Sequence, residues 1–92
     1  MKIVYNETFK SELKAILTYI AKDKPSASLN FKNKLKEYIN KIPDNPFKYR
    51  VSFYFDDKNI RDMTFKGYTI VYEINIEKEC IEILRIFNKN KP

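Results

Sequence analysis

The sequence predicts a small α+β fold, in which a helical hairpin packs on one face of an antiparallel sheet and the elements follow the order β-α-α-β-β-β-β. Two observations lead to this prediction. Apolar residues recur at helical spacing in the first half of the chain, and from Val51 onward they alternate with polar residues as in strands. The 92 residues contain no repeat, low-complexity tract or linker, so we expect one domain over residues 1–92.

A short strand over residues 2–5 is expected to precede two helices. Asn6 can cap the first helix, and Glu7 suits the positive end of its dipole. Pro25 is tolerated in the first turn of the second helix, where its missing N–H has no intrahelical partner. Each helix carries one apolar stripe: Phe9, Leu13, Ile16, Leu17 and Ile20 in the first, and Phe31, Leu35, Tyr38, Ile39 and Ile42 in the second. Because few residues separate them, the helices should form an antiparallel hairpin.

Four strands are expected after the hairpin. Alternation predicts them over residues 51–55, 60–65, 68–76 and 80–87, with turns at 56–59, at Gly67 and at 77–79. The last strand is apolar on nearly both faces, which is typical of a central strand. One helical hairpin shields only one side of a sheet, so we expect apolar area on the other side to remain uncovered for a partner.

The composition excludes several classes of site. The chain has no histidine, which rules out Ser-His-Asp relays, histidine general bases and imidazole metal ligands. It has no phosphate-binding glycine loop, nucleophile motif or metal-ligand cluster, so neither a metal nor a cofactor is expected. The single cysteine, Cys80, stands in an apolar run and suits a buried side chain in a reducing cytosol. No segment approaches the roughly 18 apolar residues of a membrane span, so we expect a cytoplasmic protein with no membrane partner.

The net charge of +6 is concentrated in the first half of the chain. Residues 1–50 hold eleven Lys and Arg against five Asp and Glu, whereas residues 51–92 hold seven of each. A basic surface favours an acidic partner, either nucleic acid or an acidic protein segment, by long-range attraction. The alternative is a solvated, lysine-rich helical face.

The order of the elements and five local strings resemble the RelE/ParE toxin superfamily, with its ParE-like branch favoured. The strings cover residues 19–27, 46–50, 60–63, 67–72 and 81–86, and the resemblance extends over nearly the whole chain. It implies the toxin of a type II toxin–antitoxin system, active in growth inhibition and plasmid stabilisation. It also implies an antitoxin that wraps a disordered segment across the toxin, and operator DNA bound only through that antitoxin.

The superfamily has two mechanistic branches. RelE-like members are ribosome-dependent mRNA endonucleases that use sheet cations and often a C-terminal tyrosine, whereas ParE-like members are associated with DNA gyrase. The cations of the nucleases fall here on Asp62 and Thr69, so an acid replaces a cation. The ParE-type ending, commonly His-x-Arg-Arg, is Asn88-Lys89-Asn90-Lys91 and keeps only its basic character. Gyrase poisoning, ribosome-dependent mRNA cleavage and a non-toxic antitoxin-binding relative all remain open, and with them the question of enzymatic activity.

The candidate binding residues are basic, aromatic or polar and lie around the sheet: Lys48, Tyr49, Arg50, Arg61, Arg85, Asn88, Lys89 and Lys91. If the protein is a nuclease, the catalytic candidates are Arg61, Arg85 and Lys89. For each candidate, a purely structural role is the alternative to a functional one. Residues 48–50 combine cations with an aromatic that can stack on a base, or they form a plain loop. The two arginines contact a phosphate or an antitoxin carboxylate, or they form ion pairs with Asp62, Glu73 or Glu82.

Overall fold

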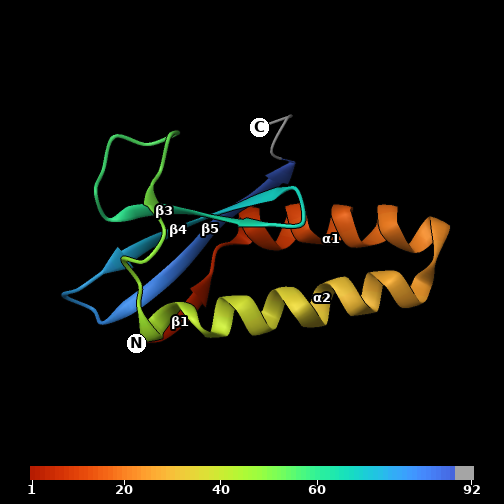
Figure 1. The fold of residues 1–92 in the computed structure, drawn as a ribbon, viewed down its shortest axis with the longest axis horizontal. Helices are drawn as coiled ribbons and strands as arrows, with labels where there is room; N and C mark the ends of the chain where they lie inside the picture. The colour runs from red at the N-terminus through yellow and green to blue at the C-terminus, as the bar shows by residue number, and fades with distance from the viewer. Residues whose placement is uncertain (89–92) are drawn as a thin grey trace.

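The computed structural model describes residues 1–88, and Figure 1 shows two helices lying side by side against a five-stranded sheet. The elements are β1 (Lys2–Tyr5), α1 (Glu7–Asp23), α2 (Pro25–Asn40), the 3-10 turn η1 (Ile42–Asp44), β2 (Arg50–Val51), β3 (Ile60–Phe65), β4 (Tyr68–Asn75) and β5 (Cys80–Asn88). The predicted α+β class and the order of the elements are confirmed. Within residues 1–88, no helix is long and apolar enough to cross a membrane.

The sheet has the strand order β1-β5-β4-β3-β2 and is mixed, because β1 runs parallel to β5 while the other pairs are antiparallel. A purely antiparallel sheet was expected. Strands that are joined by short turns pair antiparallel. The whole helical hairpin joins β1 to the rest of the sheet, so this connection does not restrict β1 to antiparallel pairing. The expectation that the last strand is central is confirmed, since β5 has a neighbour on each side.

The helices begin where the sequence predicts. The Asn6 side chain accepts a hydrogen bond from the Thr8 N–H at 2.7 Å, which caps α1, and Pro25 occupies the first turn of α2. The stripes of the two helices meet the inner face of the sheet. The resulting core consists of Phe9, Phe31, Leu35, Ile39, Ile42, Met63, Phe65, Ile70, Tyr72, Ile74, Ile81, Ile83 and Ile86. Cys80, expected to be buried, is only half-buried because it lies at the first position of β5.

A β-bulge interrupts β5 opposite the step from Val71 to Tyr72. Val71 pairs with Arg85 and Tyr72 with Ile83, so Leu84 has no partner across the ladder. An extra residue reverses the alternation beyond it. Ile86 therefore joins Ile81 and Ile83 in the core, whereas unbroken alternation would place Arg85 on their side of the sheet.

The strand predicted over residues 51–55 is wrong, since β2 ends at Val51 and a bent segment follows. Asp62 accepts a hydrogen bond from the Phe53 N–H, and the Ser52 hydroxyl accepts one from the Tyr54 N–H, each at 3.1 Å. Side chains thereby satisfy the donors that a strand would direct to a neighbour. The segment from Ser52 to Asn59, the cover loop, folds back over the outer face of the sheet.

The cover loop also corrects the expectation of an uncovered apolar side. Tyr54 packs edge-on against Phe87 of β5 with ring centroids 5.1 Å apart, so the loop spans from β3 toward β5. Thr69 and Val71 on this face are fully buried although they lie outside the helix-covered core. Apolar side chains that remain open include Phe53 on the loop itself, which is 75% exposed, and Val4 on β1, which is 39% exposed.

Candidate functional site

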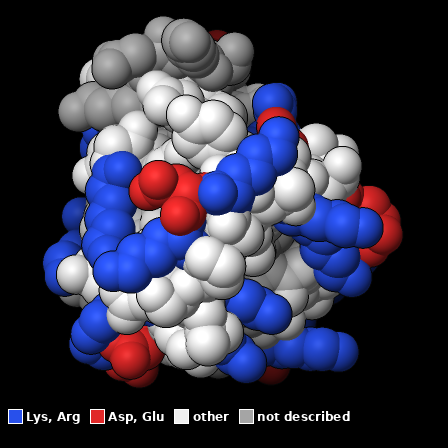
Figure 2. Space-filling view, turned by 90° about the vertical axis from the view of Figure 1, so that its right-hand side faces the viewer, with Lys and Arg blue, Asp and Glu red and all other residues white. Residues whose placement is uncertain are grey.

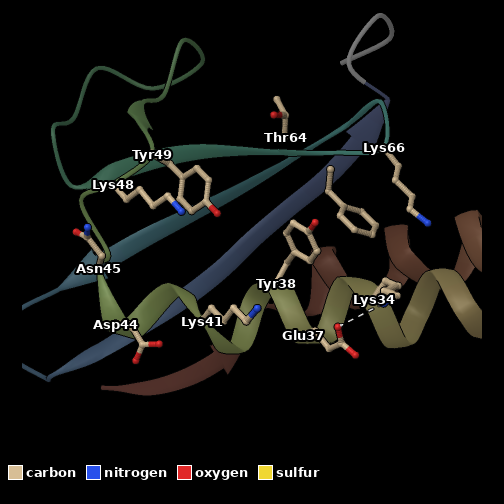
Figure 3. Close-up of a pocket in the computed structure, with 11 residues that line it drawn as sticks. Lys34, Glu37, Tyr38, Lys41, Asp44, Asn45, Lys48, Tyr49, Thr64 and Lys66 are labelled. Atoms are coloured by element: carbon tan, nitrogen blue, oxygen red, sulfur yellow. Dashed lines mark ion pairs between the residues drawn. The ribbon is translucent and has the colours of Figure 1, made fainter.

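A cleft of about 990 Å³ opens between the C-terminal half of α2 and the outer edge of β3. Figure 3 shows Lys34 and Tyr38 of α2 and Lys41, the residue after the helix, on one side, and Thr64 of β3 on the other. Lys48 and Tyr49 close one end, and Lys66 of the β3–β4 turn closes the other. We call this space, lined also by Glu37, Asp44, Asn45 and Phe65, the lysine cleft.

Four lysines and two acids line the lysine cleft, which gives it an excess of two positive charges. Lys34 and Glu37 are 3.9 Å apart, and both side chains are more than half exposed, so this pair neutralises little. The sequence identified Lys48 and Tyr49 but missed Lys34, Lys41 and Lys66. The spacing of Lys34, Tyr38 and Lys41, at i, i+4 and i+7, is the signal that places them on one helical face.

The β3–β4 turn positions Lys66 by its backbone conformation. Lys66 and Gly67 both have positive φ, +48° and +84°, as the tight two-residue turn of a hairpin requires. The turn joins Phe65 directly to Tyr68 across the ladder, so Lys66 projects from the very end of β3. Glycine supplies the second position without steric cost, which explains why the only glycine of the chain stands there.

Arg50 lies outside the lysine cleft, on β2. Its guanidinium stacks on the ring of Phe53 at 3.7 Å from the centroid. The Nη2 atom is 3.5 Å from Oδ2 of Asp62, a long ion pair with a carboxylate that has no exposed surface. Arg50 is therefore turned toward the cover loop rather than toward Lys48.

Arg61 holds loop backbone. Its Nε donates to the carbonyl of Lys58 at 2.9 Å, and its Nη1 donates to those of Phe47 and Tyr49 at 3.2 and 2.9 Å. Within residues 1–88 these partners are carbonyl groups and not the acid of the predicted structural alternative, while the contact with a phosphate or an antitoxin carboxylate stays a prediction. Arg61 therefore ties the segment before β2 to the segment before β3.

Arg85 is paired with Glu12 of α1. Its Nε lies 2.9 Å from both carboxylate oxygens and its Nη2 lies 2.7 Å from Oε2. These hydrogen bonds raise the pKa of the Arg85 guanidinium above its ordinary value. The same carboxylate accepts the Ile86 N–H at 3.1 Å, where β1 no longer covers β5. The acid is thus on the helix, and not on the neighbouring strands where Glu73 and Glu82 were considered.

The remaining candidates belong to the end of the chain. Asn88 is the last residue of β5 and is exposed. Lys89 and Lys91 lie outside the described residues. The sequence of this tail remains basic and follows directly from the central strand.

The two positions that correspond to nuclease cations are both buried. Asp62 is 2% exposed and Thr69 is fully buried. One oxygen of Asp62 accepts the Phe53 N–H, and the other is buried without a hydrogen-bond partner within residues 1–88, as is the Thr69 hydroxyl. Both positions are packed into the protein.

The basic side chains extend over the helical end of the molecule. Figure 2 looks at the end that carries the α1–α2 turn, and most of the charged side chains there are lysine or arginine. The β4–β5 turn, at the opposite end of the molecule in Figure 1, carries Glu77 and Glu79 beside Lys78. The charge is therefore distributed unevenly along the long axis.

Comparisons with known proteins show the family and the fold of this chain. The model of the ParE toxin family, described as the ParE toxin of the type II toxin–antitoxin system parDE, matches residues 3–91. A solved structure described as the chromosomal ParDE toxin–antitoxin system from P. aeruginosa shares the fold at a TM-score of 0.75 and 16% identity, covering 96% of this chain and 95% of that one. No curated protein matches the chain in sequence. On the family match, this chain belongs to the ParE toxins of type II toxin–antitoxin systems.

Proposed function

We propose that this chain is a toxin that binds DNA gyrase and that a cognate antitoxin silences it. Membership of the ParE family supports a target protein rather than an RNA substrate. The observation that carries the choice between the two branches is the burial of Asp62 and Thr69.

Cleavage of RNA passes through a transition state of high negative charge, which needs preorganised cations that the substrate can reach. At the corresponding positions this chain has an acid and a neutral hydroxyl; both are buried, and Asp62 is hydrogen-bonded to the cover loop at Phe53. Arg50, the cross-strand partner of Asp62, stacks on Phe53, and Arg61, the neighbour of Asp62 in the sequence, donates to carbonyl groups. This arrangement favours a binding protein over a ribosome-dependent nuclease.

The basic tail is the proposed contact with gyrase. Asn88 is the last residue of β5, Lys89 and Lys91 follow it in the sequence, and replacing the two lysines by alanine removes two positive charges. Lys78 in the β4–β5 turn is an exposed lysine that precedes β5, whereas the tail follows β5, and it provides a matched control.

The test is an assay of DNA supercoiling and DNA cleavage with purified gyrase, at a salt concentration close to that of the cytoplasm. Wild-type protein at micromolar concentration should inhibit supercoiling or trap cleaved DNA. Lys89→Ala combined with Lys91→Ala should raise the half-inhibitory concentration at least about tenfold, roughly 1.4 kcal/mol, while Lys78→Ala should leave it within about twofold. Absence of any effect from protein that still binds antitoxin would refute the gyrase target.

Two other outcomes are informative. Primer extension on translated mRNA after induction should show no codon-spaced cuts. Such cuts in the ribosomal A site would instead show that the protein is a ribosome-dependent mRNA endonuclease. If growth continues normally after induction of soluble protein, the chain is a non-toxic relative that only binds antitoxin.

Neutralisation by an antitoxin is supported by exposed apolar residues on a basic surface. Tyr19 and Leu29 on the hairpin are 73% and 61% exposed, and Phe53 on the cover loop is 75% exposed. An acidic segment with apolar residues would cover such positions and gain from charge pairing, although its ordering opposes binding. Coexpression should raise the melting temperature, and high salt should weaken the complex mainly by slowing association. If the toxin alone has the same melting temperature as the coexpressed complex, and if no acidic segment binds it below about 1 µM, this part of the proposal is refuted.

A further inference from the structure

Another groove, of about 480 Å³, runs between the two helices, which lie side by side in Figure 1. All of its lining residues belong to α1 or α2. Lys10, Lys14 and Thr18 of α1 and Lys32 of α2 are the exposed ones. We call this space the hairpin groove, and its half-buried lining residues are Leu13, Leu17, Ala21 and Ser28.

Two hydroxyl groups of the hairpin groove donate to helix backbone and are not free to donate to a ligand. The Ser28 hydroxyl donates to the Leu17 carbonyl at 2.8 Å, which joins the start of α2 to α1. The Thr18 hydroxyl donates to the Lys14 carbonyl at 2.9 Å, one turn back in the same helix. The donors left for a ligand are therefore the three lysine ammonium groups, each on a flexible four-carbon stem.

The three lysines of the hairpin groove have little charge compensation. Within residues 1–88, Lys14 and Lys32 form no ion pair. Lys10 lies 3.0 Å from Glu7, but the Glu7 side chain is 88% exposed, and such a surface pair is weak. The hairpin groove therefore carries a concentrated positive charge.

Acids that are close in the sequence do not offset this charge. Glu12 is the only acid over residues 10–22, and Arg85 of β5 binds its carboxylate at 2.7 Å. Over residues 24–36 every charged residue is a lysine. Among the residues that the structure describes, the lining of the hairpin groove contains no carboxylate that would compete with a bound anion.

The other lining residues indicate which anion fits. Within the described part of the chain, the hairpin groove is lined by no aromatic residue and no arginine. It therefore lacks the rings on which bases stack and the anchors that dominate the energetics of protein interfaces. Leu13 and Leu17 already pack against the core, so they offer a partner helix only part of their apolar surface. Lysines alone suit phosphate groups, which they contact as point charges without reading a base.

The length of the hairpin groove suits a nucleic acid duplex. Residues 10–21 of α1 extend over about 17 Å, at a rise of about 1.5 Å per residue. Duplex DNA carries one phosphate per about 1.7 Å of its axis, so roughly ten phosphates lie along this length. A single strand presents about half as many, and its bases meet no aromatic ring among the described lining residues. A duplex therefore fits better than a single strand.

We propose that the hairpin groove binds the phosphate backbone of duplex DNA directly, through Lys10, Lys14 and Lys32 and without regard to base sequence. The resemblance to the toxin superfamily implied operator DNA bound only through an antitoxin, whereas this contact belongs to the chain itself. The choice of DNA over duplex RNA rests on the proposed function, because gyrase works on duplex DNA. A toxin that contacts this DNA as well as the enzyme has two attachments to one complex and dissociates from it more slowly.

The first experiment measures binding of the whole chain to a fluorescent duplex of about 20 base pairs by anisotropy, without gyrase or antitoxin. Three phosphate contacts give a slope of about −2.7 for the logarithm of affinity against the logarithm of salt concentration. The affinity should therefore fall about fortyfold between about 50 and 200 mM salt. Lys14→Gln combined with Lys32→Gln should make the slope shallower by about 1.8. An unchanged slope in this variant would overturn the proposal.

Lys34→Gln combined with Lys41→Gln provides the matched control, because it removes the same charge from the lysine cleft. It should change the slope by less than about 0.5. Glutamine is nearly as favourable in a helix as lysine, so both double variants should keep the fold, which circular dichroism checks. Equal changes of slope in the two variants would show that net charge, and not the hairpin groove, attracts DNA, and the proposal would fail.

The second experiment places an acid in the hairpin groove. Thr18→Glu adds a carboxylate to the lining and should weaken duplex binding at least about tenfold at low salt. Tyr19→Glu adds the same charge at the next position, where the side chain is 73% exposed and does not line the groove. Tyr19→Glu should weaken binding by less than about threefold. Equal weakening by the two acids would contradict a site in the groove.

Three rival ligands are measured in the same way. An oligothymidylate with the same number of phosphates, a duplex RNA of the same length and a polyglutamate of the same charge should each bind no more tightly than the DNA duplex. Tighter binding of a rival, lost in Lys14→Gln combined with Lys32→Gln, would assign the hairpin groove to that ligand and overturn the proposal. The anisotropy assay contains no gyrase, so a failed DNA site leaves the gyrase target standing, and a failed gyrase target leaves the DNA contact standing.

Discussion

Arg85 of β5 holds Glu12 of α1 through two parallel hydrogen bonds, 2.9 Å from Nε to Oε1 and 2.7 Å from Nη2 to Oε2. Glu12 also accepts the Ile86 N–H, so a single carboxylate joins the first helix to the exposed edge of the central strand. Bidentate pairs of this kind are stronger and more directional than ordinary surface ion pairs. This contact links sequence positions 73 residues apart.

Breaking this contact should destabilise the protein measurably. Glu12→Ala should lower the free energy of unfolding by about 1–2 kcal/mol, because the Ile86 N–H and the guanidinium both lose their acceptor. The 39% exposure of the Arg85 side chain limits the effect. A double-mutant cycle with Arg85→Ala, followed by urea unfolding, should give a coupling energy near 1 kcal/mol. Additive single effects would show that the pair contributes nothing.

Arg61 should control the order of the cover loop. Arg61→Ala removes donors from three carbonyls, and we expect a loss of about 2 kcal/mol and faster amide exchange at residues 53–60. Arg61→Lys keeps the charge but cannot reach three carbonyls with one ammonium, so exchange should remain fast. Slow exchange in the lysine variant would mean that charge, and not the hydrogen-bond fork, orders the segment.

Tyr72 should make stability fall in alkaline solution. Burial raises the pKa of its phenol above the ordinary value, while Arg61 opposes the shift, and the hydroxyl donates to the Pro46 carbonyl at 2.6 Å. Because the folded-state pKa exceeds the unfolded one, the stabilisation is complete below about pH 10 and is lost as the pH rises above that value.

The variant Tyr72→Phe tests this pH dependence. It should cost about 1 kcal/mol at pH 7, since the Pro46 carbonyl loses its donor, but its stability should depend less on pH between about 9 and 11. Tyr5, whose pKa burial also raises, keeps part of the slope, so Tyr5→Phe serves as the comparison. Urea unfolding across this range provides the measurement. Identical slopes in wild type and Tyr72→Phe would contradict the assignment.

Thr69 should be replaceable by an apolar residue with a gain in stability. Its hydroxyl is buried without a partner within residues 1–88, so Thr69→Val removes a desolvated polar group at nearly constant volume. We expect an increase of about 1 kcal/mol in the free energy of unfolding, with Thr64→Val on the exposed side as a control near zero. Gyrase inhibition should be unchanged. A loss of stability would indicate that the hydroxyl has a bound partner.

The cover loop shows where local pattern was insufficient. Residues 51–55 alternate as a strand does, yet the carboxylate of Asp62 and the hydroxyl of Ser52 capture the donors at Phe53 and Tyr54. Asp62 is nine residues away from Phe53, so the alternation of residues 51–55 cannot predict this hydrogen bond.

The sequence by itself determined the elements and most of their faces. The apolar stripes fixed both helices, Asn6 and Pro25 fixed their starts, Gly67 fixed a hairpin turn, and the ordered strings identified the superfamily. These features follow from interactions among residues close in the chain, whose spacing reflects the local period. Lys48 and Arg50 were recognised as candidates because they flank Tyr49 directly in the sequence.

Only the tertiary structure decided what the arginines contact and where the open surface lies. Glu12 meets Arg85 across 73 residues, and Lys66 of the β3–β4 turn lines the same cleft as Lys34 of α2. The lysine cleft exists because β2 stops after two residues while β3 continues, a difference fixed by long-range hydrogen bonds. Such contacts depend on the distances between segments that are remote in the sequence, and the periodicity of the sequence does not predict those distances.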